Sequence, residues 1–124
     1  MTRRILIVDD EDDIREVAQV SLELVGKWEV RTAASASDGI DGARAEHPDA
    51  ILLDVMMPDM DGPTTLERLR ADPATSHIPV VFLTAKTQAA DRSRLAGLGA
   101  AGILTKPFDP LTLPSQIAAV LHWE

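Results

Sequence analysis

The sequence predicts an α/β fold built on an open, doubly wound, five-stranded parallel sheet with helices on both faces. The first observation is a set of continuous apolar runs, which are typical of strands that are covered on both faces. The second is that segments with apolar residues at helical spacing lie between these runs. Strict alternation of strands and helices indicates a parallel, doubly wound sheet.

The strands themselves fall into two kinds. One strand is expected at Trp28–Ala33, where Trp28, Val30 and Thr32 alternate with two charged residues. This alternation suits a half-exposed strand at the edge of the sheet. The other four runs are nearly all apolar and suit buried strands. They are Arg4–Val8, Ala50–Leu53, Val80–Leu83 and Gly102–Leu104.

The first two helices are predicted from an apolar stripe and from a capping pattern. Gly26 is expected to stop the first helix. Ser35, with Asp38 three residues later, resembles a capping pair for the second, although Gly39 and Gly42 weaken that helix. The residues expected on the buried stripe of the first helix are Ile14, Val17, Ala18, Leu22 and Val25.

Three further helices follow in the second half of the chain. Pro63 suits the first position of the third helix. Thr87 can cap the fourth, and Gly99 lies just past its end. The last helix is expected to begin near Thr112 or Leu113, because the proline that follows cannot donate a backbone hydrogen bond.

Composition bounds the functions that the chain can have. Its 124 residues fit one domain over residues 1–124, and without cysteine there is neither a disulfide framework nor a zinc finger. No apolar run approaches the roughly 20 residues of a membrane span, and the apolar stretch before Asp9 is too short for a signal peptide. We therefore expect a cytoplasmic protein without membrane contact.

The chain is acidic, with a formal net charge of −8. An acidic surface repels phosphate backbones, so we expect no direct binding of nucleic acid. The same acidity suits a protein that holds cations, or it only aids solubility. The charge alone does not distinguish these two interpretations.

Charged or hydroxyl side chains follow four of the five predicted strands. Asp9 and Asp10 end the first strand, Asp54 the third, Thr84 the fourth and Lys106 the fifth. Ligands bind beyond the carboxyl ends of the strands in such sheets, so these side chains are expected to converge on one crevice.

Crowded carboxylates need a counter-charge. Two carboxylates about 5 Å apart repel by roughly 3 kcal/mol at an effective dielectric constant near 20. Raised pKa values or a bound cation would relieve this, and carboxylate oxygens suit Mg²⁺, with Mn²⁺ as a substitute. Asp54 could then act as a nucleophile toward phosphorus, while the cation, Lys106 and Thr84 each stabilise one phosphoryl oxygen.

Four short motifs carry a resemblance that extends over essentially the whole chain. They are I-L-I-V-D-D-E at 5–11, D-V-M-M-P-D-M-D-G at 54–62, L-T-A at 83–85 and T-K-P-F at 105–108. In this order and spacing the sequence resembles the response-regulator receiver domain of two-component signalling. The resemblance implies a flavodoxin-like (CheY-like) three-layer sandwich with strand order 2-1-3-4-5.

The resemblance also implies a metal site. Asp10, Asp54 and the backbone carbonyl of Met56 would bind Mg²⁺ directly, and Asp9 would bind it through water. Asp12 is instead expected to be a solvated acid in the first turn of a helix, as is the residue after it.

The expected function follows from the same resemblance. Asp54 would accept a phosphoryl group from the phosphohistidine of a sensor histidine kinase or phosphotransfer protein. Thr84 would move toward this group and Lys106 would pair with it, and the Lys106–Pro107 bond would be cis. The resulting change of conformation would control a downstream protein target, with the domain acting as a monomer or weak dimer.

The sequence departs from the family's pattern at Ile103, where many receivers carry an aromatic residue that turns inward on activation. Whether the domain signals through the face formed by the fourth helix, the fifth strand and the last helix therefore stays open. Lys86, two residues after Thr84, and Met56 flank the reaction centre and would tune the lifetime of the phosphate. No output domain follows Glu124, so the chain resembles a stand-alone receiver, although a piece of a larger regulator would look the same.

Two other functions compete with the phosphorylated receiver. The alternative is a pseudo-receiver that binds partners without ever accepting phosphate, but every reactive position is filled. The other is a metal-dependent phosphatase acting through an aspartyl phosphate. Such enzymes usually carry a second acid two residues after the nucleophile, where this chain has Met56. We therefore expect no turnover of an external substrate.

Overall fold

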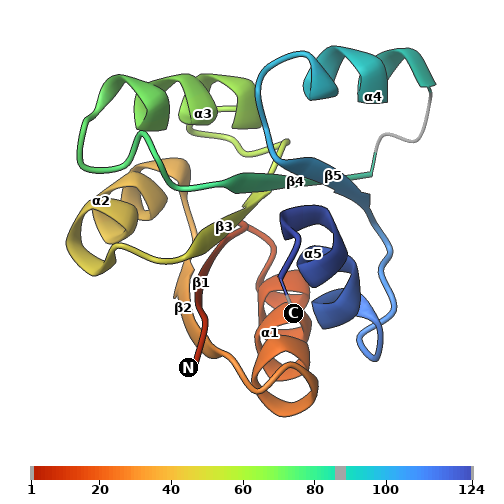
Figure 1. Ribbon diagram of the computed structural model, residues 1–124. Coiled ribbons are helices and arrows are strands. Elements are labelled where there is room, and N and C mark those ends of the chain that lie inside the picture. The colour runs from red at the N-terminus through yellow and green to blue at the C-terminus, as the bar shows by residue number, and fades with distance from the viewer. Residues whose placement is uncertain (1, 86–88, 124) are drawn as a thin grey trace.

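A five-stranded parallel sheet forms the centre of the molecule, as predicted (Figure 1). The computed structural model describes residues 2–85 and 89–123, with only the backbone at residues 89–92. The strand order is β2-β1-β3-β4-β5, which confirms both the predicted fold class and the predicted order. The strands are β1 (Arg4–Val8), β2 (Glu29–Ala33), β3 (Ala50–Asp54), β4 (Val80–Thr84) and β5 (Gly102–Thr105).

Helices cover both faces of the sheet and complete a three-layer sandwich (Figure 1). Side chains alternate between the two faces along each strand. Leu6 and Val8 of β1 pack with the α2, α3 and α4 layer, whereas Ile5 and Ile7 pack with the α1 and α5 layer. The helical segments are α1 (Asp12–Val20), η1 (Ser21–Val25), α2 (Ala36–Glu46), α3 (Gly62–Ala71), α4 (Ala89–Ala96) and α5 (Leu113–Leu121).

Strand β2 lies at the edge of the sheet, as the alternating pattern predicted. Trp28 precedes the strand rather than beginning it. Val30 is buried as expected, but Thr32 is exposed, and Ala33 is buried instead against the other helical layer. An edge strand has a neighbour on one side only, so burial depends on the helix above each residue and not on alternation alone.

The first helix does not bury its whole predicted stripe. Ala18 and Leu22 are fully buried, whereas Val17 and Val25 are 42% and 46% exposed, so the prediction was wrong for these two. Val17 is one residue before the buried Ala18, so its side chain is rotated from that of Ala18 by about 100° around the helix. The chain continues from Val20 as the π-helix η1, whose wider turn changes the facing of later residues.

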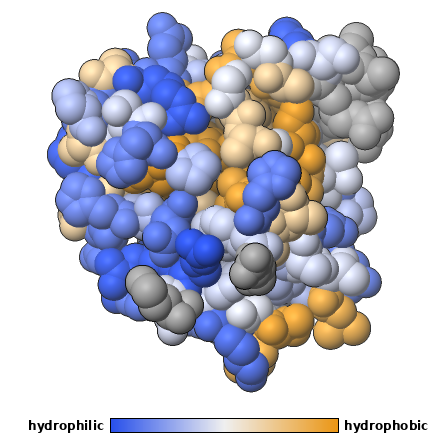
Figure 2. Space-filling model, viewed as in Figure 1, coloured by the Kyte–Doolittle hydropathy of each residue, from blue (hydrophilic) through white to orange (hydrophobic). Residues whose placement is uncertain are grey.

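Exposed apolar side chains therefore gather beside α1 and η1. Figure 2 shows hydrophobic residues at the lower right of the view. A surface groove of about 400 Å³ is lined there by residues of these two segments together with Pro110 and Leu111. This groove lies outside the polar cluster that the strand ends form.

Gly26 follows η1, as predicted, but for a different reason. Its φ of −76° is ordinary, and the left-handed conformation is taken by Lys27 at φ 62°. A side chain at Gly26 would place its Cβ 2.8 Å from the Leu22 carbonyl oxygen and 3.1 Å from Pro114 Cβ. Close contacts with η1's own backbone and with α5, and not backbone freedom, therefore favour glycine here.

The remaining helix ends agree well with the sequence patterns. The Ser35 hydroxyl accepts a hydrogen bond from the Asp38 amide at 3.1 Å, which confirms the predicted cap. Pro63 lies in the first turn of α3, and α5 begins at Leu113. The predicted cap at Thr87 and the predicted role of Lys86 lie outside the described residues. Gly99 follows α4 with φ 90°.

The two ends of the described chain meet at an aromatic cluster. The rings of Trp28 and Trp123 are edge to face with centroids 5.2 Å apart. The Arg3 guanidinium lies 4.7 Å from the centroid of the Trp123 ring. Trp123 is thus a packing residue. Among the helices of residues 2–85 and 89–123, none has the length and apolarity that a membrane span needs.

Candidate functional site

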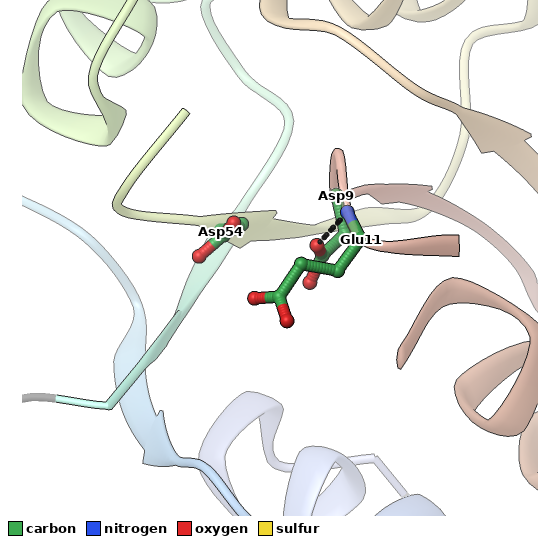
Figure 3. A group of neighbouring side chains, drawn as sticks. All are labelled: Asp9, Glu11 and Asp54. Carbon is green, nitrogen blue, oxygen red and sulfur yellow. Dashed lines mark hydrogen bonds between the residues drawn. The ribbon is translucent and has the colours of Figure 1, made fainter. Parts of the chain in front are cut away.

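Three of the predicted site residues converge at the carboxyl edge of the sheet. Asp9 follows β1, Asp54 ends β3, and Lys106 follows β5. β1 and β3 are neighbours, with Val8 opposite Leu53, so Asp9 and Asp54 lie side by side. Figure 3 shows both carboxylates pointing into the same space, together with Glu11.

Lys106 holds this cluster together. Its Nζ lies 3.2 Å from Asp54 Oδ1, 3.1 Å from Asp9 Oδ2 and 3.0 Å from Glu11 Oε1. It donates hydrogen bonds to Asp54 and Glu11. The contact with Asp9 is an ion pair without hydrogen-bond geometry, since Asp9 Oδ2 accepts no hydrogen bond from the described residues.

Two buried carboxylate oxygens are left for another ligand. Asp9 and Asp54 are only 1% and 2% exposed, and within the described part of the chain Oδ2 of each has no hydrogen-bond partner. Buried polar atoms are rarely left in this state. One oxygen each of Asp9, Glu11 and Asp54 lies within 4.8 Å of the others. The donor set is hard and anionic, which fits Mg²⁺.

Glu11 was not predicted as a member of the cluster. Asp10, which was, is exposed and lies outside the group of acids whose oxygens come together. Its proposed contact with a metal stays a prediction. The available signal was the run of acids after β1, but the sequence does not say which of three consecutive acids turns inward. The backbone between β1 and α1 decides that.

The electrostatics of the site reflect burial and crowding. Burial raises the pKa of Asp54 to about 6, and the negative charge of Asp9 adds to the rise, while Lys106 opposes it. For Lys106, burial acts to lower the pKa. The hydrogen bond to Glu11 and the charges of Asp54 and Asp9 outweigh burial, so that the Lys106 pKa is raised.

Met56 and Thr84 lie next to this cluster. The Met56 amide donates to Asp54 Oδ1 at 3.3 Å, and its side chain is exposed. Thr84 ends β4 and is fully buried, and its carbonyl oxygen accepts a hydrogen bond from the Lys106 amide at 2.8 Å. Both residues therefore stand at the predicted place. Their proposed roles toward a metal and a phosphoryl group stay predictions.

The loop after Asp54 is anchored to its surroundings. Asp59 accepts hydrogen bonds from the amides of Ala36 and Ser37 at the start of α2, at 3.2 and 3.1 Å. These bonds keep the pKa of Asp59 below its usual value. The Gly62 amide donates to the Val55 carbonyl oxygen at 2.8 Å. The loop that carries Met56 is thus held at both ends.

Two features near Lys106 bear on the expected switch. The Lys106–Pro107 bond is cis, as the resemblance implied. Ile103 stands opposite Phe82 in the sheet and packs, half-buried, against the core on the α2–α4 side.

Comparison with known proteins places this geometry in a context. Residues 5–118 match the family model of the response regulator receiver domain. The probable transcriptional regulator ycf27 of Cyanophora paradoxa is 40% identical over 120 residues, which cover 97% of this chain and 48% of that protein. The DNA-binding dual master transcriptional regulator RpaA of Synechocystis is 40% identical over 119 residues, covering 96% of this chain and 49% of RpaA. The chain spans about half the length of these relatives.

Solved structures give the same picture for the fold. The chemotaxis response regulator CheY4 of Vibrio cholerae superposes with a TM-score of 0.88 at 32% identity, covering 97% of this chain and 99% of that one. A response regulator from Chloroflexus aurantiacus gives 0.88 at 34% identity, covering 98% and 99%.

Proposed function

Because the chain belongs to the response regulator receiver family of two-component signalling, we propose that it accepts a phosphoryl group on Asp54 from a histidine kinase or phosphotransfer protein. The observation that carries this proposal is the state of the Asp54 carboxylate. It is buried at the end of β3, with Oδ1 held by Lys106 and the Met56 amide. Within the described residues, Oδ2 has no hydrogen-bond partner, so the carboxylate keeps lone pairs for a cation and for phosphorus.

The proposed transfer forms one bond and breaks one. One carboxylate oxygen of Asp54 bonds to phosphorus as the phosphorus–nitrogen bond of the donor's phosphohistidine breaks. The donor imidazole leaves with the electron pair. Lys106 moves from Asp54 Oδ1 toward a phosphoryl oxygen, and the Thr84 hydroxyl donates to another. Such a reaction depends mainly on positioning and on stabilising charge.

A divalent cation completes the proposed site. Asp9, Asp10, Asp54 and the Met56 carbonyl would hold Mg²⁺, or Mn²⁺ in its place. The oxygens of Asp9 and Asp54 that accept no hydrogen bond from the described residues support a cation there, as do the crowded charges. When bound, the ion supplies positive charge to the phosphoryl oxygens.

The domain is proposed to act on itself and not as a turnover enzyme. Its output would be a conformational change that a downstream protein recognises on the domain, as a monomer or weak dimer in the cytoplasm. Two of the relatives carry the words transcriptional regulator in their names. The chain spans about half of each, so a role in transcription is not carried over here.

Incubation with acetyl phosphate and Mg²⁺ tests the proposal. Intact-mass and peptide mapping should find one phosphoryl group per chain, on Asp54. Asp54→Asn should abolish it, whereas Asp13→Asn, which alters an exposed acid near the site, should leave it unchanged. Modification that persists in Asp54→Asn, or none in the parent chain with normal partner binding, would favour a pseudo-receiver.

A further inference from the structure

Glu11 occupies a position where an acid usually serves its own helix. It is the N-cap residue of α1, and acidic side chains favour the first turn of a helix. In the described chain its carboxylate makes no capping hydrogen bond to α1. It lies instead 3.0 Å from Lys106 Nζ, a residue 95 positions later in the chain. The Glu11 side chain thus binds Lys106 and does not cap α1.

The three carboxylates around Lys106 are not equivalent. Asp9 and Asp54 are buried, and each accepts a hydrogen bond from a backbone amide. Asp9 Oδ1 accepts from the Glu11 amide at 2.9 Å, and Asp54 Oδ1 from the Met56 amide at 3.3 Å. The Glu11 side chain is 59% exposed and reaches Lys106 from the solvent side. It is the partner that water can replace most easily.

The hydrogen-bonding capacity of Lys106 makes this difference matter. An ammonium group has three N–H donors. Lys106 donates to Glu11 and Asp54 while lying 3.1 Å from Asp9. All three carboxylates lie within 3.2 Å of Nζ, so moving the ammonium toward a phosphoryl oxygen lengthens its contact with at least one of them. A phosphodonor must reach the site from solvent, and Glu11 is the exposed one of the three carboxylates.

We propose that Glu11 is a positioning residue that competes with the incoming phosphoryl group for Lys106 and so slows phosphorylation of Asp54. This inference rests on the proposed function. In the unphosphorylated domain Glu11 holds the ammonium at the mouth of the site and adds a negative charge there. When phosphate arrives, Lys106 transfers to it and Glu11 returns to water.

Glu11→Gln tests the competition because it keeps the length of the side chain and removes its charge. Asp13→Asn is the matched control, since it makes the same change of charge at an exposed residue that is not among the acids paired with Lys106. With acetyl phosphate and saturating Mg²⁺, Glu11→Gln should be phosphorylated about two- to fivefold faster, the range expected when an exposed ion pair is lost. The concentration of beryllofluoride needed for half-saturation should fall by a similar factor.

A second readout does not depend on phosphorylation. The ¹⁵N chemical shift of the Lys106 ammonium, measured by NMR in the whole chain, should move in Glu11→Gln and stay in place in Asp13→Asn. If the Lys106 chemical shift is the same in Glu11→Gln as in the parent chain, the contact on which the inference depends is absent and the inference is wrong.

Three other outcomes would each contradict the competition between Glu11 and the phosphoryl group. If Glu11→Gln and Asp13→Asn give equal rates, only general repulsion acts and the competition is wrong. If Glu11→Gln needs about tenfold more Mg²⁺ for the same maximal rate, Glu11 is a metal ligand and not a competitor. If the parent chain is not phosphorylated on Asp54, the proposed function falls and this inference falls with it.

Discussion

Lys106 Nζ lies 3.2 Å from Asp54 Oδ1, although the two residues are 52 positions apart. Strand β4 lies between their strands, with Leu83 opposite Asp54 and Thr84 opposite Thr105. The side chains therefore meet across the end of β4, at the edge of the sheet where all the parallel strands have their carboxyl ends. This relationship makes stability and chemistry depend on the same charges.

Loss of the ammonium should destabilise the fold. Lys106→Met leaves Asp9 and Asp54 buried without their cation, and breaking a buried ion pair on one side is costly. We expect the free energy of unfolding at neutral pH to fall by about 1–3 kcal/mol, measured by urea titration without Mg²⁺. Lys27→Met removes an exposed lysine and should change it by less than about 0.5 kcal/mol. Equal effects would contradict the importance of the ion pairs.

Neutralising Asp54 should have the opposite effect. The pKa of Asp54 is raised from 3.8 to about 6, so the folded state binds more protons than the unfolded state between these values. Stability contributed by this group is therefore lost as the pH rises through that window. Asp54→Asn should be more stable than the parent by about 1–3 kcal/mol above pH 6, and the gap should close toward pH 4.

Urea titrations across this pH range measure that gap. Asp13→Asn supplies the control for a general change of charge, and its difference from the parent should not follow the same window. A gap for Asp54→Asn that widens on acidification would show that the carboxylate is stabilised, and not strained, in the fold.

Divalent cations should stabilise the parent chain. A ligand that binds only the folded state adds about 2.7 kcal/mol at one hundred times its dissociation constant, so millimolar Mg²⁺ should raise the melting temperature by several degrees. Asp9→Asn and Asp54→Asn each neutralise a carboxylate with an oxygen that accepts no hydrogen bond in the described chain, and each should abolish most of the rise. NaCl at matched ionic strength serves as the control. A parent chain that melts at the same temperature with and without Mg²⁺ would argue against the site.

Two glycines of one helix should respond in opposite directions to alanine. A Cβ at Gly39 would meet Val8 Cγ2 at 2.7 Å, so α2 can approach β1 only with glycine there. A Cβ at Gly42 would meet nothing closer than Leu6 Cδ1 at 3.7 Å. We expect Gly39→Ala to destabilise by about 1–3 kcal/mol and Gly42→Ala to stabilise by about 0.5–1 kcal/mol in urea unfolding. Equal effects would contradict the packing of α2.

Local patterns predicted the sheet and most of the site. Continuous apolar runs identify buried strands, and parallel strands necessarily bring Asp9, Asp54 and Lys106 to one edge. Periodicity failed where long-range geometry decides. Val25 is exposed because a π-helix interrupts the helical phase.

The same limit applies inside the site. Glu11 joins the cluster, and Asp10 faces solvent, because of how the chain turns between β1 and α1. Likewise, a glycine at position 26 is typical of a helix stop, whereas a Cβ there would meet the Leu22 carbonyl oxygen and Pro114, which lies 88 residues later in the chain. Neither a backbone turn nor a distant neighbour leaves a signal in the residue types nearby.

The aromatic cluster of Trp28 and Trp123 has a practical consequence for every measurement above. These are the only two tryptophans, and the chain has no tyrosine. Trp28 stands before β2, at the end of the sheet opposite the carboxyl edge, and its partner follows α5. Intrinsic fluorescence should therefore report the separation of Trp28 from Trp123 on unfolding. It should stay nearly silent when a cation or phosphate binds, so a ligand-induced signal needs a probe introduced near Asp54.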